Sequence, residues 1–146
     1  MLMSIAYQDT KYNDSVVVSV DPELVSCVEL NHEIVNIWFA EGGMPALHIP
    51  GDIFNATCYN IEHHFTNDLN RPCPFMFIAK NLFMNVMHVN AVTPAKIYST
   101  KRSPPAGTII LIRGLLGHID LPDANVLEIT NQINDISRVN RGGNTQ

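Results

Sequence analysis

The sequence predicts a mainly β protein: an antiparallel sandwich, jelly roll or small barrel of about 7–8 short strands, followed by one C-terminal amphipathic helix. Short apolar, β-branched segments recur through residues 15–116, and Gly, Pro and Asn turn signals separate them. From residue 123 the spacing of apolar residues changes from two to three or four. The chain of 146 residues has the length of one domain. We therefore expect a single β-rich domain over residues 1–146, with the helical tail at about 124–140.

Seven segments are expected to be strands. Each combines apolar or β-branched residues with a turn signal at its end. The first, SVVVSV, ends at Asp21-Pro22, where proline brings no N–H to a ladder. The glycines that follow Glu41 predict a hairpin over residues 33–49, and Pro45 places its second strand at a sheet edge. The segments are residues 15–20, 24–30, 33–39, 44–49, 57–65, 94–100 and 108–116.

Residues 75–89 allow two interpretations. The run FMFIAKNLFMNVMHV fits two strands around Lys80-Asn81, and it also fits one buried helix that begins near Pro74. We favour strands, because apolar residues alternate with other residues after Asn81. His88 is then expected to be a core histidine that is hydrogen-bonded to backbone.

The tail has the period of an amphipathic helix. Asp123 is placed to cap this helix, and Gly142 is placed to end it. A strand over residues 125–130, NVLEIT, is the alternative. The apolar positions of the tail are three or four residues apart: Val126, Ile129, Ile133, Ile136 and Val139.

The surface is expected to be unusually neutral. Charged residues are 16% of the chain, against about 25% in an average domain, and asparagine occurs fifteen times. Depletion of charge is typical of the core of a protein interface. The net charge of −5 makes nucleic acid an unlikely partner. Four local cations, at Lys96, Lys101, Arg102 and Arg113, are too few to reverse that expectation.

Cysteine usage and apolar runs limit the location of the protein. Cys27, Cys58 and Cys73 are an odd number without C-x-x-C spacing, so they predict neither a disulfide framework nor a zinc ribbon. The N-terminus lacks a basic head and a long apolar run, so we expect no secretory signal and a cytoplasmic or virion location. Polar residues interrupt the longest apolar stretch, residues 75–92, which is not expected to cross a membrane. No cofactor is predicted.

The segment TCYNIEHHF at residues 57–65 carries a histidine doublet. In a strand, successive side chains point to opposite faces. His63 would then lie with Phe65 on the packed face, and Glu62 would lie with His64 on a polar face. Glu62 and His64 are therefore the alternative metal site, whereas the leading expectation is no metal.

Residues 64–66, HFT, resemble the His-x-Thr motif of two-histidine phosphoesterases, in which paired histidines act as acid and base on a phosphodiester. The resemblance implies a small phosphodiester hydrolase, of the two-histidine type or metal-dependent, with His64, Thr66 and Glu62 as its candidate catalytic residues. Those enzymes carry the motif twice. The nearest second candidates here, which begin at His88 and His118, lack the Thr or Ser. A hydrolase is therefore the alternative function.

The leading hypothesis is a non-enzymatic structural or interaction subunit of a symmetric protein assembly. Its partners would be other protein subunits, in a homo-oligomer or a larger assembly, and a small virion protein (capsid decoration or minor capsid) is its most concrete form. A small-ligand-binding or inhibitory protein is the third possibility. Large aromatic side chains and an apolar helical stripe are suited to interfaces, although the same residues could belong to the intramolecular core. The expected interface residues are Trp38, Tyr59, Phe65, Val126, Ile129, Ile133 and Ile136.

Overall fold

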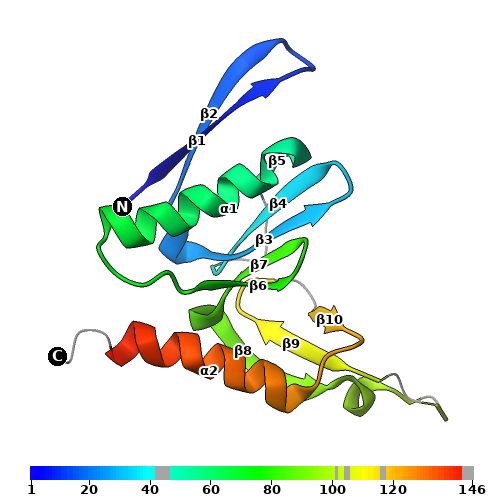
Figure 1. Cartoon of the computed structure of the whole chain (residues 1–146). Helices are drawn as coiled ribbons and strands as arrows, with labels where there is room; N and C mark the ends of the chain where they lie inside the picture. The colour runs from blue at the N-terminus through cyan, green and yellow to red at the C-terminus, as the bar shows by residue number, and fades with distance from the viewer. Residues whose placement is uncertain (42–46, 101, 104–105, 116–117, 143–146) are drawn as a thin grey trace.

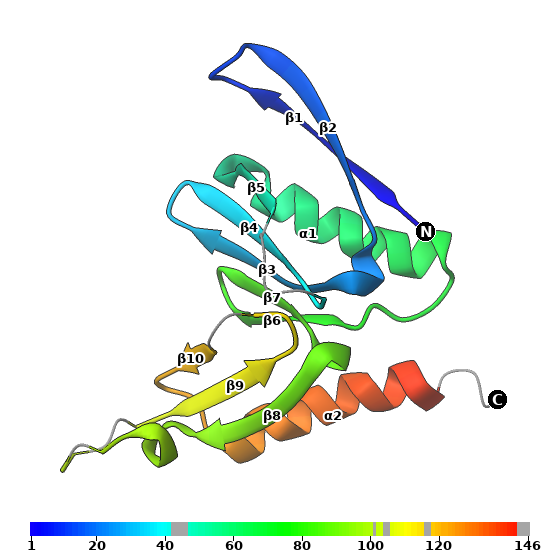
Figure 2. The same cartoon turned by 180° about the vertical axis from the view of Figure 1, so that it is seen from behind.

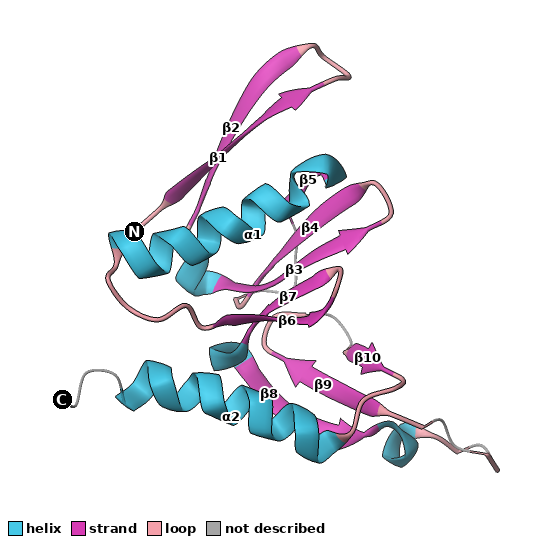
Figure 3. Cartoon of the chain, in the orientation of Figure 1, coloured by secondary structure: helices cyan, strands magenta, loops and turns pink. Residues whose placement is uncertain are grey.

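The computed structural model describes residues 1–41, 47–100, 102–103, 106–115 and 118–142. It is mainly β, with three antiparallel sheets and a C-terminal helix, so the predicted fold class is confirmed (Figure 1 and Figure 3). The described residues form ten strands: β1 (Met3–Asp9), β2 (Asp14–Val20), β3 (Val25–Asn31), β4 (Ile34–Phe39), β5 (Leu47–Pro50), β6 (Phe75–Ala79), β7 (Leu82–Asn85), β8 (Val89–Pro94), β9 (Thr108–Ile112) and β10 (Ile119–Leu121). The α-helices are α1 (Phe54–His63) and α2 (Val126–Gly142).

Strands β1 and β2 form a hairpin, here called the arm, that extends away from the rest of the molecule (Figure 1). The register pairs Met3 with Val20 at the base and Tyr7 with Val16 further out. Burial decreases along the inward face of the arm, because Met3 and Val20 are buried whereas Tyr7 and Val16 are only partly buried. Strand β2 confirms a predicted strand. Strand β1 was not expected from the sequence.

The second sheet has five strands in the order β5-β4-β3-β7-β6. Its central strand β3 is buried on both faces, with Val28 in the hydrophobic cluster on one side and Cys27 in the cluster on the other. Strands β4 and β5 pair, which confirms the hairpin predicted over residues 33–49, and β5 lies at the sheet edge. The predicted turn and Pro45 fall within residues 42–46, outside the described residues.

The strand predicted over residues 57–65 is wrong, because this segment is helical. Helix α1 is followed directly by a π-helical turn, His64–Asp68. Strand-like alternation and helical spacing coincide in this sequence, and burial follows the helical period. The buried positions lie three or four residues apart on one face, which packs against the five-stranded sheet and the arm: Phe54, Thr57 or Cys58, Ile61, and His64 or Phe65.

Residues 75–85 form two strands, β6 and β7, as predicted from the alternation of apolar residues. A 3₁₀ turn, η4 (Val86–His88), then leads directly into β8. Strands β10, β9 and β8 form the third sheet, which faces the five-stranded sheet across the second hydrophobic cluster (Figure 2). The buried strand predicted at 108–116 is confirmed over residues 108–112 by β9, whereas residues 113 and 114 form a turn.

The strand predicted at residues 94–100 is wrong. Strand β8 ends at Pro94, which has no N–H to offer a ladder. The chain then forms a 3₁₀ turn, Ala95–Tyr98, whose first N–H donates to the carbonyl of Gly107 at 3.0 Å. This turn begins a projection at the far end of the molecule from the arm (Figure 1).

Helix α2 confirms the predicted C-terminal helix but begins later than expected. Its cap is Asn125, whose Oδ1 accepts hydrogen bonds from the N–H groups of Leu127 (2.8 Å) and Glu128 (3.3 Å). The predicted cap, Asp123, is therefore wrong, while the helix extends to Gly142 as predicted.

Gly114 holds the third sheet close to the five-stranded sheet. Its φ of +80° lies in the left-handed region, which glycine adopts without a steric penalty. A Cβ at this position would lie 1.9 Å from the carbonyl oxygen of Phe39. The backbones approach so closely here that only glycine fits.

Helix α2 contributes to the core through Ile129 and Ile133, each 7% exposed. We predict that Ile133→Ala lowers the free energy of unfolding by about 2–4 kcal/mol, because it leaves a cavity. Urea denaturation measures the loss. Leu127→Ala on the same helix is the control, because Leu127 is 67% exposed, and it should cost about 0.5 kcal/mol or less. Equal losses in the two variants would contradict the packing of α2.

Candidate functional site

The histidine doublet at the end of α1 occupies two environments, but in the opposite sense to the sequence prediction. His63 is exposed, whereas His64 is 3% exposed and its Nδ1 lies 3.2 Å from Oδ2 of Asp68. Helical residues two positions apart do not share a face. Because Glu62 is exposed while His64 is buried, these two side chains do not form the alternative metal site.

The third candidate catalytic residue, Thr66, is also engaged locally. Its Oγ1 donates to the carbonyl of Glu62 at 2.9 Å. Within the part of the chain that the structure describes, no group of three or more His, Cys, Asp or Glu residues could hold a metal ion. Glu62, His64 and Thr66 are thus divided between the surface and the interior and do not form a common site.

The residues expected at an interface fall into three groups, which are buried, partly buried and exposed. Phe65 is 1% exposed and belongs to the first cluster, and Ile129 and Ile133 belong to the second, so their side chains contact the chain itself. Partly buried members are Trp38, Val126 and Ile136. Tyr59, at 65% exposure on α1, is the one fully available to a partner.

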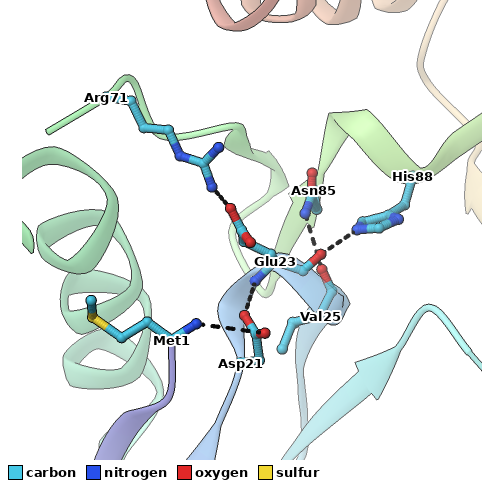
Figure 4. A network of polar contacts seen from close by, with 7 residues as sticks. All are labelled: Met1, Asp21, Glu23, Val25, Arg71, Asn85 and His88. Carbon is cyan, nitrogen blue, oxygen red and sulfur yellow. Dashed lines mark hydrogen bonds and ion pairs between the residues drawn. The ribbon is translucent and has the colours of Figure 1, made fainter. Parts of the chain in front are cut away.

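A polar network fastens a 3₁₀ turn, η1 (Pro22–Leu24), to the loop after α1 (Figure 4). The guanidinium of Arg71 pairs with the carboxylate of Glu23, and the N–H of Glu23 donates to Oδ1 of Asp21 at 3.0 Å. The N-terminal amine of Met1 lies 3.9 Å from Oδ2 of Asp21. The Arg71 and Glu23 side chains are 42% and 45% exposed, so their pair contributes about 0–1 kcal/mol.

The same turn is fastened from the other side by hydrogen bonds from Asn85, which is buried, and His88, which is partly buried (Figure 4). Asn85, 2% exposed, donates from Nδ2 to the carbonyl of Val25 at 3.2 Å. Its Oδ1 accepts the N–H of Met87 at 3.0 Å. His88 donates from Nε2 to the carbonyl of Glu23 at 2.7 Å, which confirms the predicted hydrogen bond to backbone.

The carbonyl acceptor fixes the tautomer of His88, because Nε2 must carry the proton. Partial burial, and then the positive charge of Arg113, lower the pKa of His88 below its ordinary value of 6.5. Its Nδ1 is buried and has no hydrogen-bond partner among the described residues. His88 borders a cleft of about 210 Å³ with Arg71 and Asn140, but a buried Nδ1 cannot reach a substrate there. The network therefore has a structural role.

Two hollows adjoin β10. A cleft of about 600 Å³ is lined by Tyr98, by neighbouring hydroxyl groups and by His118, whose Nε2 lies 3.1 Å from Oδ1 of Asp120. A smaller cavity of about 230 Å³ shares His118 and Asp120 and reaches Trp38 and Glu29. An aromatic ring with convergent polar groups can bind a small polar molecule. The His118 and Asp120 side chains are 43% and 69% exposed, so their pair lies at the surface.

The arm borders a third hollow, here called the arm cleft, with a volume of about 430 Å³. Its walls come from the arm, the β3–β4 turn and the segment after β5. Sequence reasoning missed this feature because it missed β1, although Met3, Ile5 and Tyr7 alternate and could have indicated a strand. Its lining includes Gln8 and Thr10 on the arm and Glu33 and Asp52 on the body.

At the opposite end of the molecule, the turn Ala95–Tyr98 and residues 99, 100, 102 and 103 form a projection, here called the spur (Figure 1 and Figure 2). It exposes Lys96 and Arg102, and Ile97 and Tyr98 are 62% and 59% exposed. The spur thus combines positive charge with apolar surface.

The described residues contain no helix that has both the length and the apolar character needed to span a bilayer. The chain matches no family model, no curated protein and no solved structure. Its function has to be inferred from these surfaces.

The lowered pKa of His88 predicts a pH-dependent stability. The unfolded chain takes up a proton at this histidine at a higher pH than the folded chain does. Stability is therefore full above about pH 6.5 and is lost as the pH falls toward the pKa of the folded state. We predict that His88→Gln, which keeps a donor but cannot titrate, flattens this dependence between pH 7 and pH 5 in urea denaturation. A control, His63→Gln at an exposed position, should leave the wild-type slope. An unchanged slope in His88→Gln would contradict the assignment.

The three thiols are expected to react slowly in the folded protein. Burial raises the pKa of Cys58 to about 12 and that of Cys73 to about 11, and it also raises the pKa of Cys27. Because the thiolate is the nucleophile, few thiols are reactive at pH 8. We predict at least a tenfold slower reaction with Ellman's reagent than in the denatured chain. Cys73, which is only partly buried, should react first, and Cys73→Ser should remove that first phase.

Proposed function

We propose that this chain is a non-enzymatic interaction subunit that assembles with further copies of itself, and that a neighbouring subunit covers the arm. The observation that carries the proposal is the two-stranded sheet β1–β2, which projects from the body and pairs with no other strand of the described residues. A two-stranded hairpin is marginally stable alone in water and needs a third strand or packing against a helix. Met3, Ile5 and Val20 at the base pack in one cluster with α1. A neighbour would add a third strand or cover the outward face.

The outward face of the arm has the composition of an interface. The alternate positions that face away from α1 carry no charged side chain, and Val17 at 64% exposure lies among them. Uncharged side chains cost less to desolvate than ions, and charge depletion marks the cores of interfaces. The residues of this face that lie outside the arm cleft are Ser4, Ala6, Ser15, Val17 and Ser19.

Other large apolar side chains at the surface add to this support. Tyr12 at the arm tip, Ile34 on β4 and Phe77 on β6 are 67%, 49% and 51% exposed. Single exposed apolar residues are normal in soluble proteins, and these three add uncharged surface on the arm, β4 and β6. A virion component, as capsid decoration or minor capsid protein, is one form of such an assembly and stays a prediction from the sequence.

We predict that the wild-type chain has a native mass that is a multiple of its 16.3 kDa, measured by light scattering after size exclusion and by native mass spectrometry. Val17→Lys should lower that mass, because it places a charge in the middle of the uncharged face. Asn134→Lys, the same charge change at an exposed position on α2 and away from the arm (Figure 1), is the control and should keep the wild-type mass. A wild-type chain that stays monomeric over a concentration series would refute the proposal.

A further inference from the structure

We propose that the copies assemble head to tail, with the spur of one copy seated in the arm cleft of the next. This inference rests on the self-assembly proposed above and names two further surfaces of contact, in addition to the outward face of the arm. The occupant of the arm cleft is thus a second copy of this chain, and the attraction between the two surfaces is electrostatic.

Charge is divided unequally between the two parts of the chain. Residues 1–85, which form the arm, α1 and the five-stranded sheet, contain ten acidic and three basic residues, a net charge of −7. Residues 86–146 contain four acidic and six basic residues, a net charge of +2, and the two parts together give the −5 of the whole chain. The end that carries the arm is therefore acidic, and the end that carries the spur is basic.

The two local surfaces follow the same division. Glu33 and Asp52, both exposed, line the arm cleft, and no Lys or Arg is among its described lining residues. The spur exposes Lys96 and Arg102, and residues 95–103 contain no acidic side chain. Opposite charges of this kind steer two surfaces together and exclude contacts between like surfaces.

The volume of the arm cleft and the side chains of the spur also support this contact. The arm cleft, at about 430 Å³, lies within the size range of pockets that enclose a ligand. The spur is narrow and carries Ile97 and Tyr98 between its two cations, so apolar side chains would enter the cleft while the charges meet its rim. Gln8 and Thr10 offer hydrogen bonds on the arm side of the cleft.

The positions of the two surfaces decide the symmetry. Both views place the arm and the spur at opposite ends of the molecule (Figure 1 and Figure 2). The spur of one chain therefore cannot occupy the arm cleft of the same chain. A contact between these two unlike surfaces repeats from one copy to the next. Such a heterologous contact produces a closed ring or an open filament.

Two charge-reversed variants test this geometry. The cleft variant carries Glu33→Lys with Asp52→Lys, and the spur variant carries Lys96→Glu with Arg102→Glu. Each variant alone then has two surfaces of like sign, so we expect its native mass to fall to that of the monomer, 16.3 kDa, and its apparent dissociation constant to rise by roughly 100-fold or more. Glu62→Lys with Glu128→Lys, at exposed positions outside both surfaces, matches the charge change of the cleft variant and should keep the wild-type mass.

Mixing the two variants in equal amounts is the decisive step. The basic cleft of one variant complements the acidic spur of the other, and the remaining unmodified cleft and spur complement each other as well. We expect the mixture to recover the wild-type mass with alternating subunits. Circular dichroism and thermal unfolding establish that each variant is folded. For a variant that does not fold, the milder pair Glu33→Gln with Asp52→Asn replaces it and should weaken assembly by about tenfold.

The outcomes separate this inference from the proposed function. A monomeric wild-type chain would overturn both. A wild-type oligomer that is unaffected by either reversal, or a pair of monomeric variants that do not assemble when mixed, would overturn the head-to-tail contact and leave self-assembly standing. Raising the salt concentration should weaken the wild-type assembly, because screening acts on exposed charges. An assembly that tightens with salt would count against the contact.

Discussion

The single passage of the chain from one sheet to the other constrains the rest of the fold. Residues 1–85 complete the arm, α1 and the five-stranded sheet, and residues 89–142 complete the third sheet and α2, so the backbone crosses between them only through η4. A buried crossing leaves backbone polar groups without ladder partners, and such groups need hydrogen bonds. Within the crossing, the N–H of Val86 donates to the carbonyl of Pro74 at 2.9 Å and the N–H of Met87 donates to Oδ1 of Asn85 at 3.0 Å. The side chains of Asn85 and His88 in turn donate to carbonyls in and next to η1. The crossing is thereby tied to the start of β3, which lies sixty residues earlier in the chain.

The start of β3 is where both hydrophobic clusters meet. Residues Val25 to Val28 are all buried, and the adjacent side chains of Cys27 and Val28 enter opposite clusters. Both faces of this segment are buried, so a polar group on either face needs a hydrogen-bond partner. The one hydroxyl there, that of Ser26, donates to the carbonyl of Trp38 at 3.1 Å. Anchoring η1 and β3 with η4 therefore aligns the two clusters on one central strand. Gly114 allows the matching close approach on the other side of the crossing.

The sequence predicts the fold class, most strands and the C-terminal helix, because their local patterns agree with their final burial. The prediction is wrong where the residue spacing fits both a strand and a helix. In residues 57–65 an alternating pattern and a helical stripe are both present, and only packing against the sheet and the arm selects the helix, which exchanges the environments of His63 and His64. The contacts of His88 with η1 and of Gly114 with β4 join segments that are distant in the sequence. They therefore cannot be predicted from the spacing of residues along the chain. The spur was likewise predicted to be a strand.

The charge division restricts the symmetry of an assembly that uses the arm cleft and the spur. A two-fold axis pairs a surface with its own copy, so an isologous contact at the arm cleft would set Glu33 and Asp52 against the same carboxylates of the partner. An isologous contact at the spur would set Lys96 and Arg102 against themselves. Like charges that face each other oppose association, whereas a contact between the two ends pairs unlike charges. Because the crossing at η4 holds the two ends in one fixed relation, the same hydrogen bonds that organise the core would also set the angle from one copy to the next.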